Sequence, residues 1–372
     1  MMYNIGFDAK RLFNNFTGLG NYSRTLVADL EQHFPQHRYH LFTPKSRRNA
    51  RTEQFYNSDR FHLHYAHGFK PLWRPWLMLK DLKKEQIDLY HGLSHEIPLG
   101  LAKTGIKSVV TIHDLIFLHY PRQYGRLDNL IYNFKFRYAC ENSDKIIAIS
   151  ESTKQDIMRF YQIKPEKIEV VYQTCDISFM QPVTTDKKTI CQKYPLPAEY
   201  LLYVGTIIER KNLLNIVKAL ELLPDAPPLA VIGKGGAYKD QVVRYVAEHG
   251  LNSRVIFLNE PTFADFPAIY HYAAAFIYPS VYEGFGIPVL EALATGTPVI
   301  TSNLSSLPEA AGPSSMLVNP LDVEELSGAI NQALSDTELR KKMIAAGKSF
   351  VERFNRNSLT GQVMQIYKQL LK

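Results

Sequence analysis

The chain of 372 residues is poor in cysteine and tryptophan, and it has no long uninterrupted apolar run. Its three cysteines, Cys140, Cys175 and Cys191, form no C-x-x-C pair, which excludes a disulfide framework or a zinc ribbon and indicates reduced thiols in the cytosol. No window reaches the roughly 18 apolar residues of a membrane span, and the first residues lack the apolar segment of a signal peptide. We therefore expect a cytoplasmic protein that is neither secreted nor membrane-spanning.

The sequence also lacks a zinc finger, an RNP-type strand and a basic heptad region, so a nucleic-acid partner is not expected. Residues 1–175 nevertheless contain 25 Lys and Arg against 17 Asp and Glu, a net charge of +8 within a total of +7. In the segment 69–84, Trp73 and Trp76 lie among leucines and interleaved basic residues. This segment predicts either an amphipathic helix packed on a sheet or one that faces an anionic membrane, and the two readings stay open.

What the chain does have is a regular alternation of short β-rich runs with segments of helical period, which predicts parallel sheets covered by helices. The length and the 45% apolar content suit two α/β domains. The expected strands of the first series are 3–7, 39–42, 87–90, 108–112, 145–149 and 168–171. Those of the second series are 200–204, 229–232, 255–258, 274–278 and 298–301.

A polar, proline-containing stretch at about 176–198 has no periodicity and predicts the linker between the two domains. We expect an N-terminal Rossmann-like domain over 1–178 and a C-terminal one over 195–352. The helical periods at 322–334, 337–350 and 358–371 predict three more helices. The segment 353–372, which holds the last of them, could cross back to the first domain.

The strongest motif is Tyr278-Pro-Ser-Val-Tyr-Glu-Gly-Phe-Gly-Ile-Pro, which joins the end of a strand to a helix through a glycine loop. Gly284 and Gly286 lack Cβ atoms, and a helix that begins just after them presents free N–H groups to an anion such as a diphosphate. Glu283 lies at the carboxyl end of the strand, and Glu291 follows inside the helix. Two carboxylates at this place could grip the hydroxyls of a ligand.

This stretch resembles the E-x7-E signature of the family 4 retaining glycosyltransferases of GT-B fold, including the Glu-Gly-Phe-Gly run. The resemblance implies two facing Rossmann-like domains, an acceptor-binding one over 1–178 and a donor-binding one over 195–352, with the donor site in the cleft between them. It also implies that Glu283 faces the donor sugar, that Glu291 holds the nucleotide ribose, and that Gly284, Phe285 and Gly286 belong to the donor site.

A second stretch, Tyr203-Val-Gly-Thr-Ile-Ile-Glu-Arg-Lys-Asn-Leu213, looks like the strand, loop and helix start that carry an Arg-Lys pair in this family. Gly205 lets the loop turn away from the strand. Arg210 and Lys211 would supply positive charge to the donor diphosphate. Asn259, after a further strand, matches the place of the family's contacts to the base, in the run Asn259-Glu260-Pro261.

In the first domain, Gly18 and Gly20 form a second glycine loop between the opening strand and a helix. By itself a G-x-G pair is a weak signal, but the family has a similar loop here. His113 follows a strand at the position where the family's histidine contacts the donor sugar, and we expect Asp114 to fix its ring. We expect structural roles for His62, His64, His67, His91 and His95.

No D-x-D triplet occurs, which argues against a metal-bridged mechanism and predicts a nucleotide sugar as co-substrate with no metal or other cofactor. The expected function is retaining transfer of a hexose, with GDP-mannose favoured over UDP-hexoses, to a glycan or lipid-linked glycan. The residues at 209–213 and 305–310 look most like those of bacterial mannosyltransferases of surface-polysaccharide assembly. A GT-B-type nucleotide-sugar epimerase or hydrolase, or a non-catalytic sugar-nucleotide-binding partner, remain alternatives. Peripheral association with the inner face of an anionic membrane is a further expectation.

Overall fold

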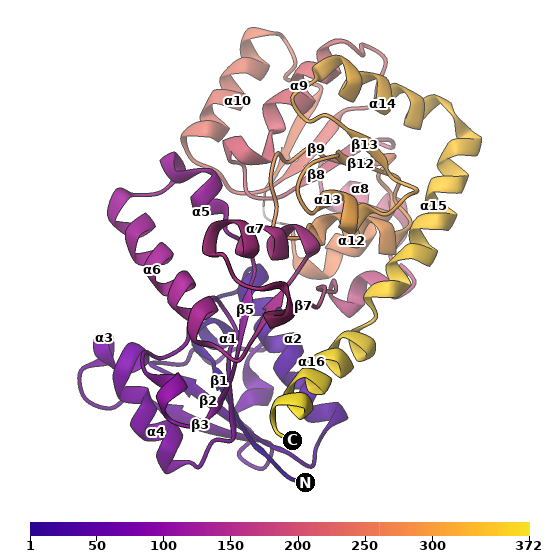
Figure 1. Ribbon diagram of the computed structural model, residues 1–372. Coiled ribbons are helices and arrows are strands. Elements are labelled where there is room, and N and C mark those ends of the chain that lie inside the picture. The colour runs from indigo at the N-terminus through magenta and orange to yellow at the C-terminus, as the bar shows by residue number, and fades with distance from the viewer. Residues whose placement is uncertain (260) are drawn as a thin grey trace. The chain divides into compact units, whose positions relative to one another are not determined.

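The computed structural model describes residues 1–259 and 261–372, and the chain forms two compact units (Figure 1). The first unit consists of residues 1–173 together with 355–372, and the second consists of residues 174–354. The C-terminal segment is therefore part of the first unit. No helix among the described residues combines the length and the apolar character that a membrane crossing requires.

The first unit contains a seven-stranded parallel sheet in the order β3-β2-β1-β4-β5-β6-β7. Strand β3 (Phe61–Tyr65) is missing from the strands predicted by the sequence. It lies at the edge of the sheet and alternates histidine with apolar residues, so it carries no continuous apolar run. The other strands are β1 (Asn4–Asp8), β2 (Arg38–Thr43), β4 (Leu89–Gly92), β5 (Lys107–Ile112), β6 (Lys145–Ala148) and β7 (Ile168–Val170).

Helices cover both faces of this sheet. On one face, Phe136, Ile157 and Leu82 join a buried apolar cluster with Phe42 of β2. On the other face, the hydroxyl of Tyr39 donates a hydrogen bond to the carbonyl of Leu30. The main helices are α1 (Lys10–Asn14), α2 (Gly18–His33), α4 (Met78–Lys84), α5 (Ile116–His119), α6 (Arg126–Asn142), α7 (Glu151–Tyr161) and α16 (Arg356–Leu370).

The tryptophan-bearing segment is helical but irregular. It runs through α3 (Lys70–Leu72), a π-helical turn at Trp73–Leu77, and α4. Trp73 is 1% exposed and its indole donates to Asp81 at 2.7 Å, whereas Trp76 is 49% exposed. One tryptophan therefore belongs to the core, and the other faces outward.

The C-terminal helix α16 packs beside α2 in the first unit (Figure 1). Arg356 forms an ion pair with Asp29 of α2, with N–O distances of 2.5 and 3.0 Å. The Tyr367 hydroxyl lies 2.5 Å from Nδ1 of His91 on β4. These contacts fix α16 to the helix and sheet with which it shares a core.

The second unit contains a six-stranded parallel sheet in the order β10-β9-β8-β11-β12-β13. Four of its strands are buried throughout, as expected for parallel strands that are covered on both faces. The sequence did not predict β13, which has only three residues and lies at the edge. The strands are β8 (Leu201–Val204), β9 (Leu229–Ile232), β10 (Val255–Leu258), β11 (Ala275–Tyr278), β12 (Val299–Ser302) and β13 (Met316–Val318).

The stretch predicted as an aperiodic linker contains a helix, α8 (Lys187–Lys193). Asp186 starts this helix by accepting a hydrogen bond from the backbone N–H of Thr189, which is an N-cap that the polar composition concealed. The other helices of the unit are α9 (Leu213–Glu221), α10 (Ala237–Glu248), α11 (Phe266–His271), α12 (Ile287–Thr295), α13 (Leu307–Ala311), α14 (Val323–Ser335) and α15 (Thr337–Val351).

Each sheet has a point at which the strand order reverses. In the first unit the chain builds outward from β1 on one side and from β4 on the other, and in the second unit it does so from β8 and β11. Loops at the carboxyl ends of two such strands diverge and leave room for a ligand. These two places are where a binding site is expected on topology alone.

Candidate functional site

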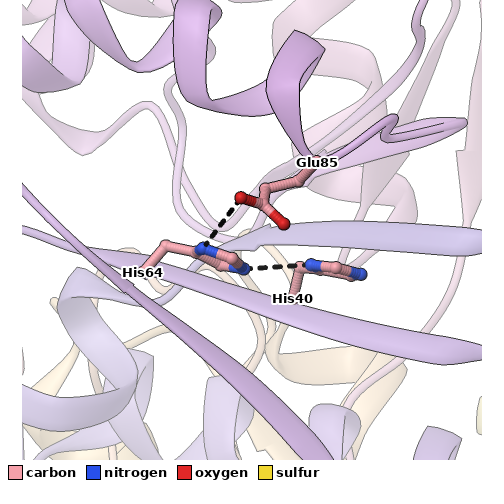
Figure 2. Close-up of side chains that lie close together, drawn as sticks. All are labelled: His40, His64 and Glu85. Atoms are coloured by element: carbon pink, nitrogen blue, oxygen red, sulfur yellow. Dashed lines mark hydrogen bonds and ion pairs between the residues drawn. The ribbon is translucent and has the colours of Figure 1, made fainter.

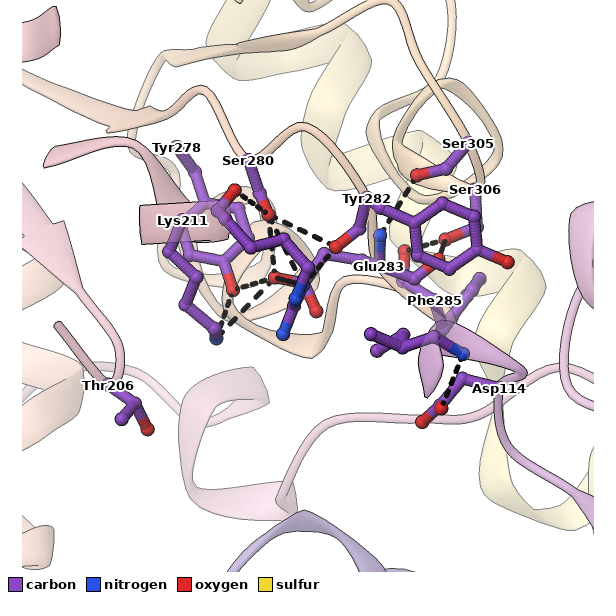
Figure 3. A network of polar contacts seen from close by, with 12 residues as sticks. Asp114, Thr206, Lys211, Tyr278, Ser280, Tyr282, Glu283, Phe285, Ser305 and Ser306 are labelled. Atoms are coloured by element: carbon purple, nitrogen blue, oxygen red, sulfur yellow. Dashed lines mark hydrogen bonds and ion pairs between the residues drawn. The ribbon is translucent and has the colours of Figure 1, made fainter. Parts of the chain in front are cut away.

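A polar cluster in the second unit joins the loops that follow β8 and β11 (Figure 3). Arg210 and Lys211 come from a short 3-10 turn (Glu209–Lys211) after β8, and Glu283 comes from the loop after β11. Arg210 Nη1 lies 3.0 Å and Lys211 Nζ lies 3.5 Å from the same oxygen, Oε1 of Glu283. The structure thus brings together three residues that the sequence proposed separately, at the point where the strand order reverses.

Two hydroxyl groups complete the surroundings of Glu283. The hydroxyls of Tyr278 and Ser280 each donate to Oε1 at 2.9 Å, and Lys211 Nζ donates to the Tyr278 hydroxyl at 2.6 Å (Figure 3). Tyr278 and Ser280 both belong to the sequence motif, but the motif predicted no role for their hydroxyl groups. Their function becomes visible only when β11 and the loop after β8 lie side by side.

The backbone of Glu283 is held by a serine pair from the segment after β12. The Glu283 N–H donates to Ser305 Oγ at 3.0 Å, and Ser306 Oγ donates to the Glu283 carbonyl at 2.8 Å (Figure 3). Three consecutive loops of the sheet therefore fix this residue, which leaves little freedom for its side chain.

The Glu283 carboxyl is ionised in spite of its burial. Its side chain is 12% exposed, and burial by itself would raise the pKa. Lys211 and Arg210, with the hydrogen bonds from Ser280 and Tyr278, outweigh burial and lower the pKa below its ordinary value. Two cations and one carboxylate leave the group with a net charge of +1, which favours an anionic ligand.

Gly286 ends the loop and begins α12 with φ = +120°, a conformation that favours glycine. A Cβ there would also lie 2.9 Å from Leu307. Gly284 is buried in the same loop, and the Phe285 ring packs against Phe354 with centroids 5.5 Å apart. Any contact of Phe285 with a ligand would thus come from its backbone.

Gly205 and the glycine-rich turn after β9 pack against each other. A Cβ on Gly233 would overlap the carbonyl oxygen of Gly205, and a Cβ on Gly205 would lie 3.3 Å from Lys211 Nζ. The close approach of the two loops therefore explains Gly233, whereas Lys211 and Tyr278 limit the space at Gly205. Asn259 is exposed after β10, and Glu260 lies outside the described residues, so the base-binding role of this segment stays a prediction.

Glu291 lies on α12, and its Oε2 accepts a hydrogen bond of 2.8 Å from the hydroxyl of Tyr270 on α11. Burial raises its pKa to about 7, and repulsion from Asp176 adds to that rise, while the Tyr270 hydrogen bond opposes it. Near neutral pH this carboxyl is divided between its acid and its carboxylate forms. It can then donate to, or accept from, a ligand hydroxyl.

In the first unit, His113 follows β5 and is 4% exposed. Its Nε2 donates to the Leu93 carbonyl at 2.9 Å, and its Nδ1 lies 2.9 Å from the Gln173 amide, which donates to it. Burial lowers the pKa of His113 to about 4, so the ring is neutral at physiological pH. Leu93 and Gln173 occupy the two ring nitrogens in place of the predicted Asp114, whose Oδ1 accepts from the backbone N–H of Ile116 (Figure 3).

The Gly18 and Gly20 loop has a structural explanation of its own. Gly18 is exposed at the start of α2, and nothing lies within 4 Å of a Cβ added to it. A Cβ on Gly20 would overlap the carbonyl oxygen of Asn15, so Gly20 is required by the loop itself. Buried Arg24 ties the same loop together by donating to the carbonyls of Leu12 and Asn15, each at 2.7 Å. Contact of Gly18 or Gly20 with a donor stays a prediction.

Within the described part of the chain, one group of side chains has the chemistry and the proximity of metal ligands: His40, His64 and Glu85 (Figure 2). His40 Nδ1 lies 3.0 Å from His64 Nε2, and His64 Nδ1 lies 4.0 Å from Glu85. Burial, and then the neighbouring histidines, lower the pKa of His40 to about 3. A hydrogen bond between two neutral rings accounts for this geometry without an ion.

Comparison with known proteins now adds to this geometry. Residues 16–179 match the model of the family described as Glycosyltransferase Family 4, and residues 186–350 match that of Glycosyl transferases group 1. This chain belongs to glycosyltransferase family 4. It is therefore a hexosyltransferase, which confirms the enzyme class that the E-x7-E motif predicted.

Two curated family 4 relatives cover most of the chain. O-antigen chain mannosyltransferase B of Escherichia coli is 32% identical over 76% of this chain and 74% of its own length. O-antigen chain mannosyltransferase RfbU of Salmonella typhimurium is 27% identical over 77% of this chain and 76% of its own length.

Among solved structures, Anabaena HepE in complex with UDP-glucose has a TM-score of 0.77 at 17% identity, covering 99% of this chain and 100% of its own. Likenesses of this kind show the GT-B fold, which confirms the predicted fold class of two Rossmann-like domains.

Proposed function

We propose that the chain transfers mannose from GDP-mannose, with retention of anomeric configuration, to a glycan or lipid-linked glycan acceptor. The observation that carries the proposal is the group of Arg210, Lys211 and Glu283 beside the start of α12, at the reversal point of the second sheet. Such a group offers fixed positive charge, a fixed carboxylate and helix N–H groups in one place.

In this proposal Arg210 and Lys211 bind the donor diphosphate. Their side chains are 8% and 14% exposed, so they are held in place and largely shielded from water. Fixed cations in a shielded site stabilise the negative charge that develops on a leaving phosphate. The N–H groups of residues 284–286 at the start of α12 would add to this stabilisation without a metal ion.

Glu283 contacts the sugar hydroxyls and does not act as a covalent nucleophile. Its Oε1 accepts hydrogen bonds from Tyr278 and Ser280 and forms ion pairs with the two cations, which lowers the basicity of the carboxylate and fixes its position. Glu291 would hold the ribose hydroxyls of the nucleotide. His113 would contribute to the reaction from the first unit as a neutral imidazole.

The choice of mannose rests on the relatives. Both curated mannosyltransferases described above carry that activity in their names and align with most of this chain. UDP-glucose in the HepE complex belongs to a protein of the same fold at low identity, and it supports a nucleotide-sugar donor in general terms. The O-antigen chain in the same two names supports a role in surface-polysaccharide assembly. The place of action in this proposal is the cytoplasm at the inner face of the membrane, and its support is the basic first half of the chain.

Purified protein would be tested for thermal stabilisation by GDP, UDP and ADP and by their sugar conjugates, with EDTA present. We expect GDP and GDP-mannose to give the largest shifts, because a ligand at 100 times its dissociation constant adds about 2.7 kcal/mol of stability. Mannosyl transfer to an α-mannoside acceptor, with EDTA present and with the product anomer identified by NMR, completes the test.

Stabilisation by UDP alone would show that the donor is a UDP-sugar and not GDP-mannose. If no nucleotide stabilises the protein, the proposed donor site is contradicted. Release of free mannose without acceptor would favour a hydrolase, and isomerised nucleotide sugar would favour an epimerase. Tight donor binding without turnover would favour a non-catalytic partner.

A further inference from the structure

The first unit contains a cavity of about 410 Å³ whose lining includes none of the donor-site residues predicted from the sequence. Asp8 at the end of β1 and Glu96, shortly after β4, both line it. These strands flank the point where the order of the first sheet reverses. The volume lies within the range of small-molecule sites, about 300–1,000 Å³.

The polar side of the cavity is a fixed ion-pair network. Arg74 donates through Nε to Asp8 at 2.9 Å and through Nη1 to Glu96 at 2.9 Å, and Lys135 lies 3.2 Å from Glu96. Asp8 is 2% exposed and the Arg74 side chain is 13% exposed. The buried pair of Asp8 and Arg74 holds Glu96 in place, while Glu96 and Lys135 are 24% and 39% exposed and can reach a ligand.

Lys10 lines the same cavity and is half-buried at the start of α1. Burial and the nearby Arg74 lower its pKa. Among the residues that the structure describes, Lys10 has no ion-pair partner, although its ammonium group is partly removed from water. A ligand oxygen would satisfy this group.

Another part of the cavity lining is apolar and exposed. Trp76, Phe134 and Leu72 line it and are 49%, 59% and 43% exposed. Trp76 lies in the π-helical turn, a distortion that is frequent at functional sites. Trp73 of the same turn is buried, so the turn presents one flat ring to the cavity while it anchors itself with the other.

The polar and the apolar parts of the lining together indicate which class of ligand fits the cavity. Asp8 and Glu96 are paired with Arg74 and Lys135, so Lys10 and Lys70 leave the lining with a net positive charge that would also attract a phosphate, and the pyrophosphate titration below tests this alternative. A purely apolar chain would leave Lys10 and Glu96 facing hydrocarbon. A sugar ring combines an apolar C–H face with hydroxyls that both donate and accept hydrogen bonds, and it matches both sides of the cavity.

We propose that this cavity binds a pyranose unit of a saccharide acceptor, with Trp76 against the ring face and with Lys10 and Glu96 on the hydroxyls. As an acceptor site it rests on the glycosyl transfer proposed above. Sugar binding itself can be measured without any donor or turnover.

The chain offers a direct readout, because Trp73 and Trp76 are its only tryptophans. Tryptophan emission would be recorded while α-mannotriose is added to the wild type and to Trp76→Phe. We expect a saturable change in the wild type and none in Trp76→Phe, whose remaining indole is buried. Lys10→Met should weaken binding about tenfold through the loss of one charged hydrogen bond. Lys103→Met, at an exposed lysine that does not line the cavity, serves as the matched control.

Maltotriose, inorganic pyrophosphate and a short prenyl alcohol would be titrated in parallel. A response to either trisaccharide that needs Trp76 and Lys10 supports the proposal. Stronger binding of pyrophosphate or of the prenyl alcohol at Trp76, or no response to either sugar, overturns it. A sugar response in a protein that lacks mannosyl transfer would contradict the proposed function and leave the sugar site standing, whereas turnover without a Trp76 response would do the reverse.

Discussion

Replacement of Glu283 by Gln tests the charge balance of the candidate donor site. The change keeps the shape of the side chain but removes the negative charge that faces Arg210 and Lys211. Loss of one partner from a buried ion pair costs about 3–5 kcal/mol, because the remaining charges stay buried without compensation. With three side chains that are 8–14% exposed, we take the lower value, about 3 kcal/mol.

That loss corresponds to a melting temperature lower by roughly 6–12 °C for the second unit, at about 2–4 °C per kcal/mol for a domain of its size. The same reasoning predicts that GDP binds the variant more tightly than the wild type, because the diphosphate then supplies the missing negative charge. We expect a dissociation constant for GDP that is lower by about tenfold. Mannosyl transfer should nevertheless fall strongly, since the sugar has lost its carboxylate contact.

Calorimetric unfolding and isothermal titration with GDP, at one fixed low ionic strength, measure both effects. Glu338→Gln is the matched control, because Glu338 pairs with Lys341 on an exposed helix face and its loss should stay within about 0.5 kcal/mol. Weaker GDP binding by Glu283→Gln than by the wild type would show that Arg210 and Lys211 do not receive the diphosphate. An unchanged melting temperature would refute the assigned burial cost.

Three further variants probe other predicted residues. The pKa of Glu291 is raised from 4.5 to about 7 in the folded protein. The protonated carboxyl therefore stabilises the folded state fully below pH 4.5, and this stabilisation is lost as the pH rises through 7. Glu291→Gln should reduce the fall in unfolding free energy between pH 5 and pH 8 by up to about 3 kcal/mol. Urea unfolding across that pH range checks this, and an unaltered pH profile would show that Glu291 is not the group responsible. Gly20→Ala should destabilise the first unit by about 1–3 kcal/mol because its Cβ overlaps the Asn15 carbonyl, while Gly18→Ala should be neutral or slightly stabilising. Equal melting temperatures for the two alanine variants would contradict that structural role of Gly20.

The sequence by itself determined the elements that depend on local pattern. Buried parallel strands read as short apolar runs, so most strands of both sheets were predicted, and the helices near 322–334, 337–350 and 358–371 were confirmed. The resemblance of the stretch around Glu283 and Glu291 to the E-x7-E signature predicted the enzyme family, and the family models confirm it. The edge strands β3 and β13 were not predicted. Strand β3 has histidines at alternate positions and β13 has only three residues, so neither contains a clear apolar run.

Only the tertiary structure decided what surrounds these residues. Arg210 and Tyr282 are 72 positions apart in the sequence, yet the strand order places their loops in contact and joins Arg210, Lys211 and Glu283. The pKa of Glu291 depends on burial beside Tyr270, which lies on a different helix. Local periodicity records which face of an element is buried, but it does not record which neighbour covers that face. The cavity beside Trp76 follows from the same cause, since Asp8, Arg74 and Glu96 meet only through the order of the strands.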